Sequence, residues 1–282
     1  MKHNMPAIDP AVPQVMAILN VTPDSFYAGS RTPDGDAVAR RVREALDEGA
    51  SIIDVGGYSS RSGADEVSPD EEWRRVRLGL AAVRQADPDV AVSVDTFRSG
   101  VVRRAVAEFG PVIVNDISAV DPDMLRAVAE LDLPYIAMHM KGDPKTMQSL
   151  TDYRRDIVTE VVGYFRSRLC DMEQAGIRRG RIILDPGFGF AKTAAQNFEL
   201  LAGLHRLCSL GCPVLAGLSR KSMIYRTLGC TPAESLAGTV ALGWECLRQG
   251  AAILRVHDVR EAADSVRLFR AFRGDTIQTT QP

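Results

Sequence analysis

Eight short apolar runs, spread along the whole chain, constrain the fold more than any other feature of the sequence. Each run holds consecutive β-branched or aliphatic residues, as parallel strands that are covered on both faces do. The runs occupy residues 15–19, 51–55, 90–94, 112–114, 134–138, 181–184, 213–216 and 252–256. Their mean spacing of about 34 residues leaves room for one helix between each strand and the next.

The segments between the runs carry apolar residues at helical spacing. The pattern is clearest at residues 36–48, 152–174, 232–249 and 259–272. A further helix is expected after Ser68, which precedes a proline and three acidic residues. Alternating strands and helices imply parallel strands with right-handed crossovers. We therefore predict an α/β chain of one domain, a (β/α)8 TIM barrel; an open doubly wound sheet is the structural alternative.

We expect the barrel to occupy residues 15–272. Residues 1–14 hold three prolines and are expected to form an extended lead-in, and residues 273–282 form a polar tail. Residues 1–14 lack the apolar core of a signal peptide, and no run approaches the ~20 apolar residues that span a bilayer. The five cysteines lack a paired C-x-x-C pattern, which indicates free thiols in a reducing compartment. We expect a cytoplasmic protein.

The charge of the chain restricts its partners. It has 34 Lys and Arg against 36 Asp and Glu, which gives a net charge of −2. That balance argues against generic binding to nucleic acid or to an acidic membrane. We therefore expect small-molecule partners, and a local basic site for a small anion stays compatible with the charge.

All eight predicted strands end at polar residues. The C-terminal ends of barrel strands meet at one face, where barrel enzymes hold their active sites. These polar residues are Asn20, Asp54, Asp95, Asn115, Asp116, His139, Asp185, Ser219, Arg220, Lys221, Arg255 and His257. Helix capping is the competing explanation, and it suits Asp116 and Ser118 because a helix must begin soon after them. Since one residue caps each helix, capping cannot account for the whole set.

Two kinds of chemistry separate within this group. One set combines two carboxylates, an amide and an ammonium, and its members are Asp95, Asn115, Asp185 and Lys221. Around one pocket they would suit a flat heterocycle that has N–H donors and a ring carbonyl. The other set has guanidiniums, an imidazole and a hydroxyl, which suit a phosphate-type anion. Its members are Ser60, Arg61, Arg255 and His257, with Asn20 nearby if the barrel closes.

Seven segments resemble the dihydropteroate synthases. They lie at residues 18–26, 54–61, 94–97, 114–117, 184–192, 217–221 and 255–258. Two are long and specific, namely Ile-Leu-Asn-Val-Thr-Pro-Asp-Ser-Phe at 18–26 and Leu-Asp-Pro-Gly-Phe-Gly-Phe-Ala-Lys at 184–192. The resemblance implies a homodimeric (β/α)8 barrel, a transferase of folate biosynthesis and a sulfonamide target. Such an enzyme condenses (7,8-dihydropterin-6-yl)methyl diphosphate with 4-aminobenzoate, giving 7,8-dihydropteroate and pyrophosphate with Mg²⁺ as cofactor.

The resemblance also implies roles for individual residues. The pterin would lie among Asp95, Asn115, Asp185 and Lys221. The diphosphate would be bound by Asn20, Ser60, Arg61, Arg255 and His257, with Mg²⁺ beside Asn20. The 4-aminobenzoate would contact Thr22, Phe26, Arg61, Ser219, Lys221 and Ser222. The catalytic set would be Arg61, Lys221, Arg255 and His257.

The chain departs from the family at residues 56–63, where Tyr58 and Ser62 replace a glutamate and a proline common among its members. Two alternatives remain open. A barrel that moves a methyl group from methyltetrahydrofolate to a corrinoid would have no use for the anion set of Arg61, Arg255 and His257. A catalytically silent pterin-binding paralogue is indicated only by Tyr58 and Ser62.

Overall fold

The computed structural model describes residues 8, 11–22, 35–58, 66–118, 121–142 and 149–275. The strands are β1 (Gln14–Asn20), β2 (Ile52–Gly56), β3 (Ala91–Asp95), β4 (Ile113–Asp116), β5 (Tyr135–Met138), β6 (Ile182–Asp185), β7 (Leu215–Ala216) and β8 (Ile253–Val256). They form one parallel sheet in the order β6-β5-β4-β3-β2-β1-β8-β7. A parallel bridge between Leu184 and Val214 joins β6 to β7 and closes the ring. The predicted single-domain (β/α)8 barrel is confirmed, and the open-sheet alternative is wrong.

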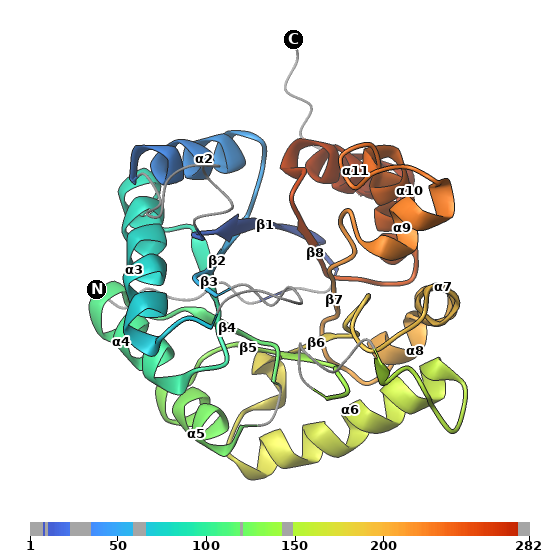
Figure 1. Cartoon of the computed structure of the whole chain (residues 1–282), viewed down its shortest axis with the longest axis horizontal. Helices are drawn as coiled ribbons and strands as arrows, with labels where there is room; N and C mark the ends of the chain where they lie inside the picture. Colours follow the sequence, from blue (N-terminus) through green and yellow to red (C-terminus); the bar gives the residue numbers. More distant parts are fainter. Residues whose placement is uncertain are drawn as a thin grey trace.

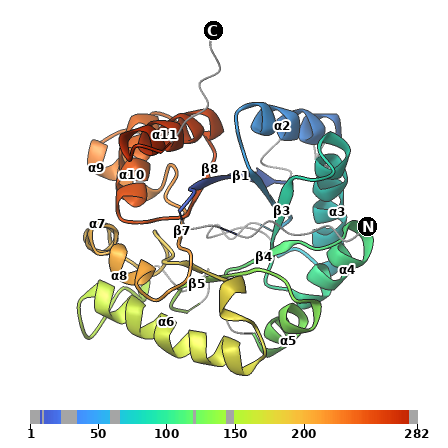
Figure 2. The same cartoon turned by 180° about the vertical axis from the view of Figure 1, so that it is seen from behind.

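Helices surround the strands in both views of the molecule (Figures 1 and 2). They are α2 (Gly35–Asp47), α3 (Pro69–Ala86), α4 (Ser99–Phe109), α5 (Pro122–Leu131), α6 (Ile157–Gln174), α7 (Ala194–Ala202), α8 (His205–Cys208), α9 (Ser222–Leu228), α10 (Leu236–Arg248) and α11 (Val259–Phe272). A 3-10 turn at Arg179–Arg181 precedes β6. Each strand therefore passes to the next through a helical layer on the outside of the barrel.

Two predicted helices begin later than expected. The helix predicted from residue 152 starts at Ile157, because the Asp156 side chain accepts a hydrogen bond from the Thr159 backbone N–H and caps the first turn there. The helix predicted from residue 232 starts at Leu236. The carbonyls of Pro232 and Ala233 instead accept hydrogen bonds from the Arg220 guanidinium, at 2.8 and 2.5 Å. Polar side chains, rather than apolar spacing, set both starts.

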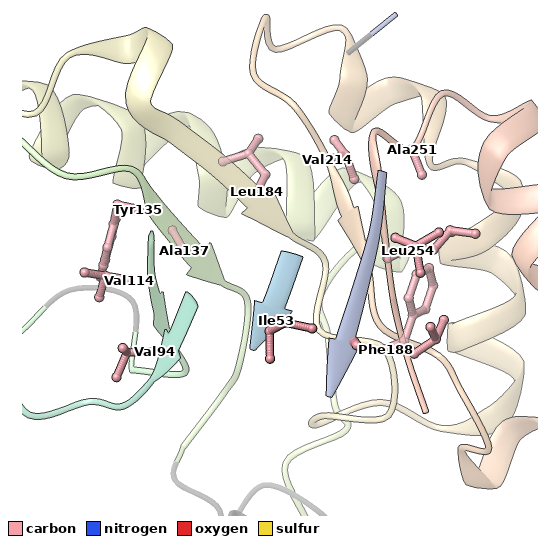
Figure 3. Close-up of a cluster of buried hydrophobic side chains, with 14 of the residues drawn as sticks. Ile53, Val94, Val114, Tyr135, Ala137, Leu184, Phe188, Val214, Ala251 and Leu254 are labelled. Carbon is pink, nitrogen blue, oxygen red and sulfur yellow. The ribbon is translucent and has the colours of Figure 1, made fainter. Parts of the chain in front are cut away.

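The barrel interior is closed at one end by an apolar plug. Every strand contributes one side chain near its start: Met16, Ile52, Ala91, Ile113, Ile136, Ile183, Leu215 and Ile253. Ala252 belongs to the same buried cluster, and Ile8 packs against it. Because side chains alternate between the two faces of a strand, the residue directly after each of these positions points outward, toward the helices. Figure 3 shows this outer layer, in which Ile53, Val94 and Leu184 belong to the larger buried cluster beneath the helices.

Several predicted segments lie wholly or largely outside the described residues. Of the lead-in 1–14, the structure describes residue 8 and residues 11–14, the last of which begins β1. Of the tail 273–282 it describes only 273–275. Phe26, Ser60, Arg61 and Ser62 also fall outside. Among the described helices, none has the length and apolar character needed to cross a membrane.

Candidate active site

The inward-facing positions just beyond the apolar plug are largely polar. On seven of the strands, the residue two positions after the plug residue also points inward, because side chains alternate. These residues are Asp54, Ser93, Asn115, Met138, Asp185, Gly217 and Arg255. These positions lie toward the C-terminal ends of the strands, where barrel enzymes hold their active sites. The fold therefore brings a ring of polar groups over an apolar base.

One cavity opens among these groups. Its lining consists of Asp95, Asn115, Ile117, Met138, Asp185, Phe190, Gly217, Lys221 and Arg255. The lining includes all four residues that the sequence assigned to a flat heterocycle, namely Asp95, Asn115, Asp185 and Lys221. Five of these nine residues carry polar or charged side chains, and Ile117, Met138 and Phe190 supply the apolar part of the wall.

Arg255 joins the carboxylates on one side of this cavity. Its Nε donates to Asp54 Oδ2 at 2.7 Å, and its Nη2 donates to Asp95 Oδ2 at 2.7 Å. Asn115 Nδ2 donates to the same Asp54 oxygen at 3.1 Å. Asp54 is only 1% exposed, and its Oδ1 has no hydrogen-bond partner among the described residues. Asp54, which does not line the cavity itself, thus binds both Arg255 and Asn115, a role that the sequence did not assign to it.

Burial shifts the pKa values of the charged groups around the cavity. It raises the pKa of Asp95 to about 7, although the Arg255 guanidinium opposes the rise. Burial also raises the pKa of Asp185, against the opposing effects of Lys221 and of the Gly187 N–H. It lowers the pKa of Lys221 to about 8, although Asp185 opposes the fall. For Arg255, the carboxylates of Asp54 and Asp95 outweigh burial and hold its pKa above the ordinary value.

Two of the polar strand ends serve the outer layer rather than the cavity. Asp116 accepts hydrogen bonds from the Tyr135 hydroxyl at 2.7 Å and from Ser118 N and Oγ at 2.8 and 2.7 Å. The helix that follows is capped by Asp121, so the predicted capping role of Asp116 and Ser118 is wrong. His139 packs edge-on against Tyr164 of α6, with ring centroids 4.8 Å apart.

A second group of predicted residues lies past the ends of β7 and β8. Ser219 Oγ and His257 Nδ1 are 3.1 Å apart, and the His257 N–H donates to the same hydroxyl at 3.3 Å. Beside them, the Arg220 guanidinium binds both carboxylate oxygens of Asp258, at 2.9 and 2.8 Å. This ion pair ties the segment after β7 to the end of β8. The structure therefore brings Ser219 and His257 together, and Lys221 and Ser222 follow Arg220 directly in the chain.

Asn20 stands at the end of β1 beside Gly56 of β2, its register partner. A Cβ on Gly56 would lie 3.4 Å from Asn20 Oδ1 and 3.6 Å from Asp95 Cβ, so the missing side chain leaves space between Asn20 and Asp95. An amide oxygen is a suitable ligand for Mg²⁺, which takes oxygen ligands and commonly keeps waters or substrate phosphates in its shell. No cluster of three or more His, Cys, Asp or Glu suited to a metal occurs in the described part of the chain. Thr22 is buried two residues further on.

Tyr58, at the departure from the family pattern, packs on two residues that follow β3. Its ring lies edge-on to Phe97 with centroids 5.2 Å apart, and the Arg98 guanidinium lies 5.4 Å from the Tyr58 ring centroid. Arg98 Nη2 also donates to the Val67 carbonyl at 2.7 Å. Tyr58 and Val67 flank residues 59–66, so Arg98 contacts the chain on both sides of the segment that contains Ser60 and Arg61.

Known proteins match the chain over nearly its whole length. Residues 16–257 match the family described as pterin binding enzyme. Dihydropteroate synthase from Escherichia coli (strain K12) is 43% identical over 266 residues, which cover 94% of this chain and 93% of that protein. A structure of Yersinia pestis dihydropteroate synthase in a sulfonamide drug complex matches with a TM-score of 0.88 and 40% identity, covering 94% of this chain and 96% of that one. A structure of the Xanthomonas albilineans enzyme with 7,8-dihydropteroate matches with a TM-score of 0.84 and 38% identity, covering 95% and 96%. The chain therefore belongs to the dihydropteroate synthase family of pterin-binding enzymes.

Proposed function

We propose that this chain condenses (7,8-dihydropterin-6-yl)methyl diphosphate with 4-aminobenzoate, giving 7,8-dihydropteroate and pyrophosphate. The observation that carries the proposal is that Asp95, Asn115, Asp185 and Lys221 line the same cavity. The bound molecules named for the similar structures, a sulfonamide drug and 7,8-dihydropteroate, support the same reaction class. The reaction makes the chain a transferase of folate biosynthesis.

The cavity groups complement the polar edge of a pterin. Asn115 donates its N–H to Asp54, which turns Oδ1 of the amide toward an incoming N–H donor. Asp185 accepts from the Gly187 N–H through Oδ1 at 2.8 Å, and Oδ2 can accept from the ring amine. Lys221 donates one proton to the Phe188 carbonyl and keeps two for a ring carbonyl. Asp95, whose pKa burial raises to about 7, completes the set of polar groups around the pterin.

The diphosphate would lie on the side of the cavity toward β8 and β1. Arg255 uses Nε and Nη2 for carboxylates, and its Nη1 donates to none of the described residues, which leaves that nitrogen for the anion. His257 is exposed beside Ser219. We assign the binding of the anion to Asn20, Ser60, Arg61, Arg255 and His257. We propose that Arg61, Lys221, Arg255 and His257 act in catalysis.

The cationic side chains of this set stabilise the pyrophosphate leaving group. As the bond between the methylene carbon and the bridging oxygen breaks, its electron pair passes to pyrophosphate, and nearby positive charge stabilises that oxygen in the transition state. The electron-rich dihydropterin delocalises the positive charge left on the methylene. The neutral aromatic amine then bonds to this carbon and loses one proton, so no strong general base is required.

We propose that 4-aminobenzoate approaches along the segment after β7. Ser219 and Ser222 flank Lys221 there, and Thr22 follows β1, which β8 separates from β7 in the sheet. Arg61 and Phe26 complete the proposed set. A sulfonamide drug, which is held by a similar enzyme, would compete for this place.

We propose that Mg²⁺ binds through Asn20 Oδ1, with diphosphate oxygens and water as its other ligands. The ion would add positive charge next to the leaving oxygens. Asn20 fits this role because its amide oxygen faces the space that Gly56 leaves open.

We propose that the enzyme is a cytoplasmic homodimer. All five cysteines are free thiols, which suits a reducing compartment. Large apolar side chains are exposed on two helices that both pack on α10: Leu228 of α9, and Leu268 and Phe272 of α11. Such exposure favours a second copy as the partner. Sedimentation of the wild-type protein against a Phe272→Lys variant tests this assignment, and a monomeric wild type would contradict it.

One assay separates this function from the alternatives. The purified protein is mixed with dihydropterin diphosphate, 4-aminobenzoate and Mg²⁺, and the products are identified by mass spectrometry. The proposal predicts dihydropteroate and pyrophosphate in equal amounts. A silent paralogue would bind the pterin without product. A methyl transferase would give no product from these substrates but would demethylate methyltetrahydrofolate in the presence of a corrinoid.

A further inference from the structure

The segment between β6 and α7 folds tightly beside the cavity, which its Phe190 lines. Gly187 and Gly189 have φ values of +65° and +79°, and Ala191 has a φ of +49°. A Cβ on Gly187 would lie 2.1 Å from the His139 carbonyl oxygen, so this glycine lies directly against the end of β5. Three left-handed residues in five positions are costly for a chain unless the surroundings hold them in place.

Lys192 holds this segment from inside the protein. Its ammonium donates to the carbonyls of Gly187 and Phe190 and to His139 Nδ1, each at 2.9 Å. The side chain is almost fully enclosed, with 5% of the residue exposed. An ammonium has three donors, and all three find acceptors here. Burial lowers the pKa of Lys192 to about 7, although the Asp185 charge opposes the fall. No described carboxylate forms an ion pair with the ammonium, so in the protonated form these three acceptors compensate for the loss of water.

His139 supplies the acceptor that comes from outside the segment. The residue is 4% exposed, and its backbone N–H donates to the Asp185 carbonyl at 2.9 Å. Burial and the neighbouring Lys192 charge lower the pKa of His139 to about 2, so the ring stays neutral. When Lys192 is protonated its ammonium can only donate, so Nδ1 accepts and the ring proton lies on Nε2. The imidazole is therefore one fixed tautomer that links the end of β5 to the segment after β6.

A second lysine binds the other side of the same segment. Lys221 donates to the Phe188 carbonyl, and its Nζ lies 4.5 Å from the centroid of the Phe190 ring. Gly189 leaves room for the Lys221 side chain, since a Cβ there would lie 3.1 Å from Lys221 Cδ. Lys221 and Phe190 both line the cavity, whereas Lys192 does not. The carbonyls that Lys192 holds thus flank the one that Lys221 uses.

We propose that Lys192 is a positioning residue for the pterin site: together with His139, it fixes the segment of residues 186–191 so that the Phe188 carbonyl and the Phe190 ring aim Lys221 into the cavity. Lys192 does not touch the substrate. The inference rests on the proposed pterin site and adds a residue that stands behind it. It gives a function to a buried lysine that forms no ion pair with a described carboxylate.

The test compares Lys192→Met with Lys141→Met. Lys141 is an exposed lysine near the end of β5 that donates to the Asp152 carbonyl at 2.6 Å, so it controls for loss of a nearby charge. Pterin affinity is measured by titration calorimetry, and the fold by circular dichroism and thermal unfolding. We expect Lys192→Met to stay folded and to bind pterin at least about tenfold more weakly, because the aim of a charged donor is lost. Lys141→Met should bind like the wild type.

A purely structural role gives a different result. The folded Lys192→Met protein would then unfold at a lower temperature but bind pterin within about twofold of the wild type, and that outcome overturns the proposal. Nitrogen NMR of the wild-type protein provides a second measurement that needs no variant. Below about pH 7, where Lys192 is protonated, we expect the Nε2–H tautomer of His139 and a slowly exchanging Lys192 ammonium. A His139 proton on Nδ1 would overturn the inference even if Lys192→Met failed to fold.

The outcomes also separate this inference from the proposed function. If the wild type binds no pterin, the function fails, while the His139 tautomer still reports on the cluster. If the wild type binds pterin and Lys192→Met binds it equally well, only the positioning role fails.

Discussion

Replacing Asp185 by asparagine should weaken pterin binding while leaving the fold intact. Asp185 Oδ1 accepts the Gly187 N–H at 2.8 Å, and Oδ2 accepts no hydrogen bond from a described residue, so it is available to the ligand. In Asp185→Asn, the amide oxygen keeps the Gly187 hydrogen bond and the NH₂ group then faces the cavity. A donor would meet the ring amine, which is also a donor.

The magnitude follows from the hydrogen bond that is lost. A hydrogen bond to a charged group contributes about 1.5–3 kcal/mol, which corresponds to roughly 10-fold to 150-fold in affinity. Lys221 also loses the neighbouring charge that opposes the fall in its pKa. Both effects act in the same direction, so we expect a loss of at least tenfold.

The assay is calorimetric titration with a pterin, and Asp121→Asn is the matched control. Asp121 also accepts backbone N–H groups, from Asp123 and Met124 at 3.0 and 2.9 Å, but it caps α5 on the exterior. Asparagine caps helices as well as aspartate does, so this control should change neither stability nor pterin affinity appreciably. An unchanged pterin affinity in folded Asp185→Asn would remove Asp185 from the site and refute the reasoning.

Three further predictions concern the rest of the site. His257→Ala should raise the Kd of pterin diphosphate but not that of a pterin without diphosphate, and equal losses for both ligands would contradict the anion role. Arg255→Ala should weaken both ligands, because it also removes the hydrogen-bond partner of Asp54 and Asp95. Asp95 keeps its proton in the folded state up to about pH 7, whereas the unfolded carboxyl loses it near pH 4. Unfolding therefore releases a proton between these pH values. Urea denaturation should show that the free energy of unfolding of the wild type falls relative to that of Asp95→Asn as the pH rises from 4 to 7, by at most about 1.4 kcal/mol per pH unit. If the two proteins instead show parallel curves of stability against pH, the raised pKa is contradicted. Tyr58→Glu removes the ring contact with Phe97 just before the segment that contains Arg61. Steady-state kinetics should show a changed KM for 4-aminobenzoate and an unchanged pterin affinity. A changed pterin affinity with an unchanged KM would show instead that Tyr58 acts on the pterin site.

The barrel and the pterin set could be predicted because one pattern encodes both. Consecutive apolar residues indicate strands buried on both faces, and the polar residue at each C-terminal end marks the shared face. Asp95, Asn115 and Asp185 follow this pattern, and they line one cavity. Lys221 could be found because it lies in the segment directly after a predicted strand.

Other features depend on which face of a strand a residue occupies, and the end of an apolar run does not show that. His139 and Asp116 end their runs yet contact the outer layer, while Met138, one residue earlier, lines the cavity. Alternation puts each of them on the opposite face from its cavity-lining neighbour, but an apolar run does not show which of its two faces points inward. Lys192 lies within a quoted motif, but its three acceptors come from a folded segment and a distant strand, which spacing in the sequence does not reveal.

The position of a bound pterin tests the central claim most directly. A crystal structure of the protein with a non-reactive pterin should show the amino-pyrimidinone edge within hydrogen-bond distance of Asp185 and Asn115, with the Lys221 ammonium at the ring carbonyl. The methylene should point toward Arg255 and His257, where the diphosphate is expected. A pterin bound elsewhere on the molecule, or a cavity left empty at saturating pterin, would contradict the account.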